Sequence, residues 1–151
     1  MARGAGLGAA RRDGPSRGGA ALMFCGLSQH TLDAKNRVFV PKRIQDCLTR
    51  TATGGTQGYL TLGQDGCLYL FPVEGFHASA GELSTRVFAD VEARAAKRLF
   101  FGLSTPVELD SSGRIVIPEE LRARVGIEKD VVIVGVEDRA ELWPAAGWNA
   151  Y

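Results

Sequence analysis

The chain has 151 residues, of which 45% are hydrophobic and 23% are charged, and 18 Lys and Arg against 17 Asp and Glu give a net charge of +1. This composition is ordinary for a globular protein of one domain or of two small fused domains. The sequence contains no apolar run long enough to span a bilayer. This near-neutral net charge excludes a nucleic-acid-binding protein that is basic over its whole surface, so any DNA-binding surface must be local.

The first 22 residues are rich in Gly, Ala and Arg and lack hydrophobic periodicity. They contain four Arg and one Asp, a net charge of +3, so the rest of the chain carries −2. The segment has no apolar core of a secretory signal, and we expect residues 1–22 to be disordered. The simpler account is that the native protein starts at Met23; a basic arm that tracks DNA is the functional alternative.

A first strand is expected over residues 23–32, followed by the turn Asp33–Arg37. Asp33 can accept hydrogen bonds from backbone N–H groups of its own turn. Asn36 tolerates a positive φ better than most residues, so the chain should turn sharply just before Arg37.

The next residues, Val38 to Val40, are typical of a short buried strand. Pro41 ends this strand and is well placed to open a helix over residues 42–48. A polar Gly/Thr loop is expected over residues 50–58, and a strand leads into Phe71 and Pro72.

Two helices are expected in the middle of the chain. The first covers residues 72–82, and the second begins after a candidate N-cap, Asp90, runs from Val91 to Phe101 and is capped by Gly102. The second helix is expected to pack across the barrel. Its Leu99-Phe100-Phe101 run offers more apolar surface than one face needs, which also fits a contact between subunits.

The stretch Leu32–Pro41 then recurs as Leu109–Pro118, with every matching position at one constant offset. Both copies read apolar residue, Asp, three small or polar residues, Arg, three apolar residues, Pro, and Gly113 stands in the place of Asn36. A second helix of this kind is expected over residues 119–125, with Gly126 as its C-cap.

The similarity continues, because residues 135–144 match residues 63–72 at an offset that is five positions shorter. The first copy therefore has five extra residues, which fall in the loop 50–58. In the second copy, Val131 to Val136 is typical of a strand buried on both sides, and Trp143 and Trp148 are expected as anchors in the core or at a subunit seam. Each repeat is only about 45 residues long, too small to bury much core alone. We therefore expect two repeats that share one core around a pseudo-two-fold axis, with interleaved hairpins.

In these features the chain resembles the MraZ family of bacterial transcriptional regulators. The resemblance covers residues 23–151 and rests on these motifs: Met23-Phe24-Cys25-Gly26, the two Asp-x-x-x-Arg turns, Gly63 to Pro72, the helical stretch Arg94 to Phe101, and Val131 to Trp143. The family usually has Gly before Arg in both turns, so Asn36 is a departure that we expect the turn to survive, slightly strained.

The resemblance implies a mixed α+β, mainly β fold, in which two SpoVT-AbrB-like swapped-hairpin half-barrels are fused. It implies domains over residues 27–74 and 104–147, joined by a helical linker over residues 75–103. It also implies a cytoplasmic, nucleoid-associated protein that forms a ring-like homo-oligomer and binds repeated sites in double-stranded DNA. The promoter implied is that of division and cell-wall genes.

Arg37 and Arg114 are the candidate base-reading residues, because the guanidinium fork matches guanine O6 and N7 or a phosphate. Lys35, Lys42 and Arg43 make the first repeat locally basic and are candidate phosphate contacts. The candidate loop-fixing residues are Asp33, Asn36, Asp110 and Gly113. The alternative is that both Asp–Arg pairs are purely structural ion pairs and that the protein is a self-assembling interaction module.

Other chemistry has little support in the sequence. It contains no paired-carboxylate site that we can place, no Ser/His/Asp order and no phosphate-binding GxxxxGK loop. Its three cysteines, Cys25, Cys47 and Cys67, lack the CxxC spacing of a zinc site, and their odd number fits a reducing compartment. We therefore expect no enzyme activity, metal, cofactor, small-molecule substrate or membrane partner.

Overall fold

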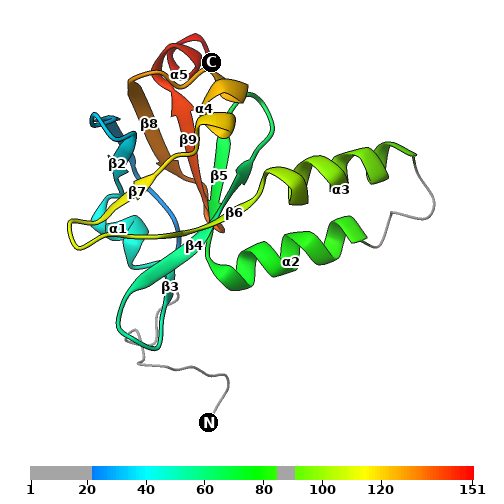
Figure 1. Ribbon diagram of the computed structural model, residues 1–151, viewed down its shortest axis with the longest axis horizontal. Coiled ribbons are helices and arrows are strands. Elements are labelled where there is room, and N and C mark those ends of the chain that lie inside the picture. Colours follow the sequence, from blue (N-terminus) through cyan, green and yellow to red (C-terminus); the bar gives the residue numbers. More distant parts are fainter. Residues whose placement is uncertain (1–21, 85–90) are drawn as a thin grey trace.

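The computed structural model describes residues 22–84 and 91–151 (Figure 1). Residues 1–21 of the N-terminal extension, which we expected to be disordered, lie outside the described residues, and so does the candidate N-cap Asp90. Residues 22–84 contain the elements β1 (Leu27–Thr31), β2 (Arg37–Phe39), α1 (Lys42–Gln45), β3 (Thr49–Arg50), β4 (Thr56–Leu62), β5 (Leu68–Phe71) and α2 (Val73–Ser84). Residues 91–151 contain α3 (Val91–Leu103), β6 (Thr105–Glu108), β7 (Arg114–Val116), α4 (Glu119–Val125), β8 (Asp130–Gly135), β9 (Ala140–Pro144) and α5 (Ala145–Ala150).

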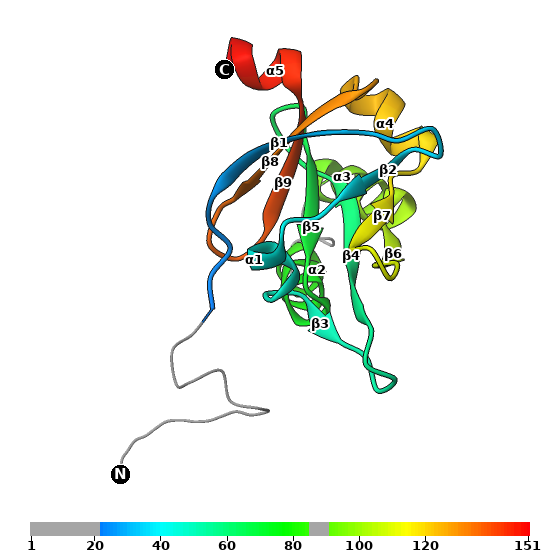
Figure 2. The same ribbon diagram turned by 90° about the vertical axis from the view of Figure 1, so that its left-hand side faces the viewer.

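The strands of the two halves are interleaved. The larger sheet has the order β1-β8-β9-β5-β4-β3, with β6 also paired to β4, and the smaller sheet is the ribbon β2–β7 (Figure 2). Every pair is antiparallel, and β1–β8, β5–β9, β4–β6 and β2–β7 each join one strand from each half. The predicted mixed α+β, mainly β fold with two interleaved repeats is therefore confirmed.

One hydrophobic core is built from both halves. Val38 and Ile115 pair directly in the ribbon and are both almost fully buried. They occupy matching positions of the two repeats, so the pseudo-two-fold axis passes between them. Around them pack the other buried apolar side chains of this core: Phe24, Leu32, Val40, Ile44, Leu48, Leu60, Leu68, Leu70, Ile117, Leu121, Ile127, Val131, Ile133, Ala140 and Leu142. The shared core is what a single repeat lacks, since so short a chain buries about 60% or less of its surface.

A second, smaller cluster lies on the other side of the sheet. It contains Cys67, Val132 and Trp143, with Trp148 packed against it at 5.4 Å between the ring centroids of the two tryptophans. Trp143 and Trp148 are thus anchors of this cluster. Burial raises the pKa of the Cys67 thiol to about 12, so this cysteine is an unreactive core residue.

Helices α2 and α3 lie side by side and project from the body of the barrel (Figure 1). Phe76 of α2 stacks on Phe100 of α3 with ring centroids 5.2 Å apart. Leu99 and Phe101 remain 45% and 40% exposed. None of the helices in residues 22–84 and 91–151 is long and apolar enough to cross a membrane.

The structure corrects the prediction that Gly102 caps α3. The helix includes Gly102 and ends at Leu103. Because the chain enters β6 directly at Thr105, it makes no left-handed reversal of the kind that favours glycine after a helix. Gly126, by contrast, is the C-cap of α4 with φ +82°, as predicted.

Other boundaries also differ from the predictions, and the larger differences have a local cause. The first strand begins at Leu27 rather than Met23, because Gly26 adopts φ +95° and interrupts it. Helix α1 ends at Gln45, three residues before the expected Leu48. The expected loop 50–58 is a hairpin in which β3 pairs with the start of β4, since its threonines favour extended backbone.

Candidate functional site

The first Asp-x-x-x-Arg turn is closed by its own aspartate. One carboxylate oxygen of Asp33 accepts hydrogen bonds from the backbone N–H groups of Lys35 and Arg37, both at 2.9 Å. The backbone adds two bonds, from Asn36 N to Asp33 O and from Asp33 N to Arg37 O, both at 3.0 Å. Asn36 has φ +61°, the left-handed conformation that the sequence predicted.

The second turn repeats this geometry atom for atom. Asp110 accepts hydrogen bonds from the backbone N–H groups of Ser112 and Arg114, again at 2.9 Å. Gly113 has φ +80° in the place of Asn36, and its N–H donates to Asp110 O at 2.9 Å. Both turns therefore deliver an arginine to the first position of a strand with its backbone fixed.

Backbone hydrogen bonds between the two halves hold each turn against the opposite ribbon strand. Val40 N donates to Gly113 O at 2.9 Å, and Ile117 N donates to Asn36 O at 3.0 Å. Within each half, a side chain of the helix after the ribbon strand adds one bond. Gln45 Nε2 donates to Val40 O at 2.7 Å, and Arg122 Nε donates to Ile117 O at 3.0 Å. Gln45 and Arg122 also occupy matching positions of the repeat, although the Asp-x-x-x-Arg motif does not include them.

The side chains of the two turns meet in one cluster of four charges, Asp33, Arg37, Asp110 and Arg114, which we call the Asp–Arg cluster. Within each turn, arginine Nε lies 2.8 Å or 3.0 Å from the carboxylate of its own aspartate. Between the turns, Arg114 Nη1 lies 3.4 Å from Asp33, and Arg37 Nη1 lies 3.9 Å from Asp110. The structure thus brings together all four residues that the repeat pointed to, and their side chains are 27–33% exposed.

The hydrogen bonds of the cluster stabilise both carboxylates in their charged form. The Arg37 backbone N–H is the main cause that lowers the pKa of Asp33, from 3.8 to about 2, with the Arg37 guanidinium adding to it. The Arg114 backbone N–H lowers the pKa of Asp110 in the same way. At neutral pH the cluster therefore holds two negative and two positive charges.

The three predicted phosphate contacts are not members of this charge cluster, and their side chains lie in different settings. Lys35 is exposed within the first turn. Lys42 Nζ lies 3.0 Å from the carboxylate of Asp46. Arg43 Nε donates to Cys25 O at 2.9 Å, so this side chain ties α1 to the segment before β1.

Two exposed apolar side chains lie beside the arginines, and the sequence motifs did not predict them. Phe39 is 44% exposed and Val116 is 53% exposed, although both stand in short apolar runs that are typical of buried strands. The strict alternation of strand side chains could have found them, because Val38 and Ile115 point into the core and their neighbours must point outward.

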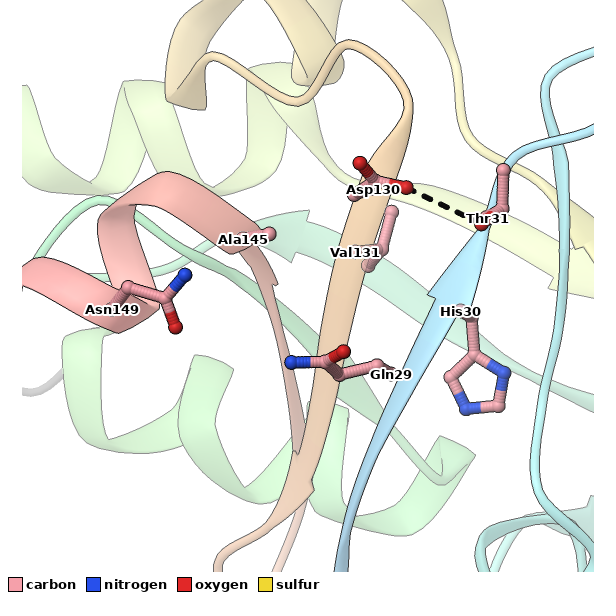
Figure 3. A pocket seen from close by; sticks show the side chains of 7 residues that line it. All are labelled: Gln29, His30, Thr31, Asp130, Val131, Ala145 and Asn149. Carbon is pink, nitrogen blue, oxygen red and sulfur yellow. Dashed lines mark hydrogen bonds between the residues drawn. The ribbon is translucent and has the colours of Figure 1, made fainter.

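A cavity of about 440 Å³ lies beside α5, where Gln29, His30, Thr31, Asp130, Val131, Ala145 and Asn149 line it (Figure 3). Gln29 extends toward Asn149, whereas His30 points to the other side of β1. Burial lowers the pKa of His30, whose ring lies 2.7 Å from the Ser28 hydroxyl. These lining residues do not converge as an acid, a base and a nucleophile. In the described part of the chain, no three His, Cys, Asp or Glu side chains are grouped to hold a metal ion.

The repeat and its paired turns match one family of proteins. The model of the family described as MraZ protein, putative antitoxin-like, matches residues 23–99 and, in a second segment, residues 100–151. The chain belongs to the MraZ family. It is 40% identical over 129 residues to the transcriptional regulator MraZ of Clostridium beijerinckii, covering 85% of this chain and 87% of that protein.

Further MraZ relatives agree with this placement. The transcriptional regulator MraZ of Symbiobacterium thermophilum is 42% identical over 123 residues, which is 82% of this chain and 85% of the relative. That of Acetivibrio thermocellus is 40% identical over 129 residues, 85% and 86% of the two chains. These MraZ relatives are named regulators, not enzymes.

Proposed function

We propose that this protein is a DNA-binding transcriptional regulator that reads bases with Arg37 and Arg114. The observation that carries the proposal is the pair of arginines presented at the two ends of one short ribbon by two identical turns. The names of its MraZ relatives support the assignment to the class of transcriptional regulators. The geometry of the two turns supports the choice of Arg37 and Arg114 as the base-reading residues.

The ion pairs of the Asp–Arg cluster favour pre-ordered arginines. In each turn the aspartate binds Nε, the inner nitrogen of the guanidinium, so the side chain is held in one direction. Nη1 of each arginine lies further from the aspartate of the other turn, at 3.9 Å for Arg37 and 3.4 Å for Arg114. A guanine O6 and N7 are read bidentately by such a guanidinium, with little entropy left to lose on binding.

We propose Lys35, Lys42 and Arg43 as the phosphate contacts of this surface. Lys35 lies in the first turn, and Lys42 and Arg43 begin the helix that follows the first ribbon strand. The matching helix of the second repeat begins instead with Glu119 and Glu120. We therefore propose that the first repeat supplies most of the phosphate contacts and the second repeat fewer.

The proposed operator is a set of short repeated sites at the promoter of division and cell-wall genes. The test is a fluorescence-polarisation titration of the full chain on a duplex from the region upstream of its own gene and on a scrambled duplex. Selective binding that weakens steeply with salt is expected, because Lys and Arg displace condensed counterions. Equal binding to both duplexes would contradict a sequence-specific regulator.

Substitution of Arg37 tests whether this arginine reads a base. Arg37→Ala should weaken specific binding by about 1–3 kcal/mol, the range for one bidentate base contact. Arg37→Lys should restore little, because lysine keeps the charge but lacks the fork. The matched control is Arg124→Ala, since Arg124 is an exposed arginine of α4, paired with Glu120 at 3.5 Å, and belongs to neither turn.

A second candidate function is supported by the same cluster. All four charges have partners inside the chain, which is what a purely structural role requires. In that case the protein is an interaction module, and Arg37→Ala lowers the free energy of unfolding or disrupts assembly. A folded, assembled Arg37→Ala protein that has lost DNA binding supports the regulator and excludes the module.

We also propose that the protein acts as a ring-like homo-oligomer. The α2–α3 pair projects from the barrel and leaves Val91, Leu99 and Phe101 exposed, which fits a contact with a second copy. Light scattering after size exclusion should give a mass several times that of one chain. A double variant Leu99→Ser, Phe101→Ser should lower that mass, and a monomeric parent protein would contradict the ring. The domain limits 27–74 and 104–147, with the linker 75–103, and a nucleoid location stay predictions.

A further inference from the structure

The outward face of the β2–β7 ribbon carries two arginines and two exposed apolar side chains in alternating places. Arg37 stands opposite Val116, and Phe39 stands opposite Arg114. Directly opposed side chains in an antiparallel pair have Cβ atoms about 4.5–5.5 Å apart. Each proposed base-reading arginine therefore has one exposed apolar neighbour across the ribbon, and we call Phe39 and Val116 the apolar pair.

The fold gives the apolar pair no core to fill. Val38 and Ile115, their neighbours along the strands, are almost fully buried on the inner side of the ribbon. Phe39 lies over the second turn, where a Cβ added to Gly113 would stand 3.1 Å from its ring, and its ring centroid is 6.2 Å from that of His30. Its remaining surface, 44%, faces outward beside the Asp–Arg cluster.

The combination of arginines and apolar side chains on this face, not its net charge, points to DNA as the partner. An exposed phenylalanine and valine in isolation would fit any apolar surface, but each is set beside an arginine with its backbone fixed. In the major groove every A·T pair shows the thymine C5-methyl group, and Phe is among the side chains that contact it. The same groove shows the guanine O6 and N7 that the arginines match, and it is wide enough for a two-stranded ribbon.

We infer that Phe39 and Val116 are specificity-determining residues that contact thymine methyl groups next to the bases read by Arg37 and Arg114. This inference rests on the proposed function and adds apolar contacts with bases to the hydrogen bonds proposed for the arginines. The two repeats should contact thymine methyl groups to different extents. The Phe39 ring is larger than the side chain of Val116, which occupies the matching place in the second repeat. Phe39 should account for more of the methyl discrimination than Val116.

The test uses the promoter duplex and the same duplex with every thymine replaced by uracil, which removes only the methyl groups. Polarisation titrations compare the full-length parent with Phe39→Ala, Val116→Ala and Phe39→Leu, each checked for folding by circular dichroism. The parent should bind the uracil duplex about fourfold more weakly for each methyl group it contacts, the factor for burying one such group. Phe39→Ala should reduce this ratio strongly, Val116→Ala less, and Phe39→Leu should keep most of it.

The control variant is Leu27→Ala, which removes a 54% exposed apolar side chain of β1, outside the ribbon and the α2–α3 pair, and should leave the ratio unchanged. Uracil also alters duplex stiffness, but that effect is the same for parent and variants. Equal binding of the parent to both duplexes overturns the inference and leaves the proposed function standing. A ratio that persists in both alanine variants also overturns it. Absence of selective binding to the thymine duplex overturns the proposed function itself, and the inference with it.

Discussion

At the scale of single residues, Asp33 joins the backbone of the first turn to the ion pairs of the Asp–Arg cluster. Its pKa is about 2 in the folded protein and 3.8 in the unfolded reference, chiefly because of the Arg37 backbone N–H. A carboxyl group with a lowered folded pKa stabilises the fold above its unfolded pKa and loses that contribution as the pH falls toward the folded value. The stabilising effect of Asp33 should therefore be complete above about pH 5 and disappear between about pH 4 and 2.

Asp33→Asn tests this pH dependence, because asparagine still accepts the backbone hydrogen bonds but carries no charge. Urea unfolding at neutral pH should show the variant less stable than the parent. The difference should shrink as the pH falls below about 4, since the parent then loses its charge at this position too. A difference that stays constant from about pH 7 to about pH 2.5 would contradict the assignment of the lowered pKa to Asp33.

Gly113 is the second residue whose chemistry the turn depends on. Its φ of +80° is costly for an L-residue, and an added Cβ would overlap the Gln45 amide nitrogen. Gly113→Ala should therefore lower the free energy of unfolding by about 1–2 kcal/mol or more. Thermal and urea denaturation measure this loss.

The matched control is Gly81→Ala in α2, where an added Cβ meets open space. There the same substitution should raise helix stability, by up to about 1 kcal/mol, because glycine is a poor helix former. Equal effects at the two positions would show that the turn does not require glycine.

At the scale of elements, the β2–β7 ribbon ties the site to the core through one buried pair. Ile115→Ala should cost about 2–5 kcal/mol of unfolding free energy, and Ile115→Val about 0.5–1.5 kcal/mol, since the side chain is 1% exposed and directly opposite Val38. Urea unfolding of the three proteins gives the comparison. A loss of under about 1 kcal/mol for Ile115→Ala would mean that the ribbon is held mainly by the turns.

Local chemistry made several elements predictable from the sequence. The left-handed turn residues Asn36 and Gly113, the strands after them and the helix that Gly126 caps all follow from short-range preferences. The internal repeat made interleaving predictable because neither half has enough apolar surface alone. The prediction for Gly102 was wrong because a glycine near a helix end caps it only when the chain reverses there.

The connections between the turns could not be predicted locally. Sequence spacing pairs Asp33 with Arg37, and it gives no reason to pair Asp33 with Arg114, 81 residues away. That contact exists because the ribbon register sets Phe39 opposite Arg114. The same register places the exposed apolar side chains beside the arginines, so the composition of the candidate site depends on tertiary pairing.

At the scale of the whole molecule, each half supplies strands that the other half needs. β1 borders β8, and β5 borders β9, so separation would leave both halves with unpaired strand edges and open apolar faces. The buried cluster around Val38 and Ile115 would be divided between two chains. Neither half should therefore fold stably without the other.

Splitting the chain between Ser84 and Val91 tests this directly. Each fragment alone should give a circular dichroism spectrum of a largely unfolded chain and poorly dispersed NMR amide signals. An equimolar mixture should recover a dispersed spectrum, because β1–β8, β5–β9, β4–β6 and β2–β7 can re-form between the fragments. The recovered complex should unfold at lower temperature at lower concentration, since association has replaced an intramolecular step. Fragments that fold independently would show that each repeat has a sufficient core of its own, against the shared core described above.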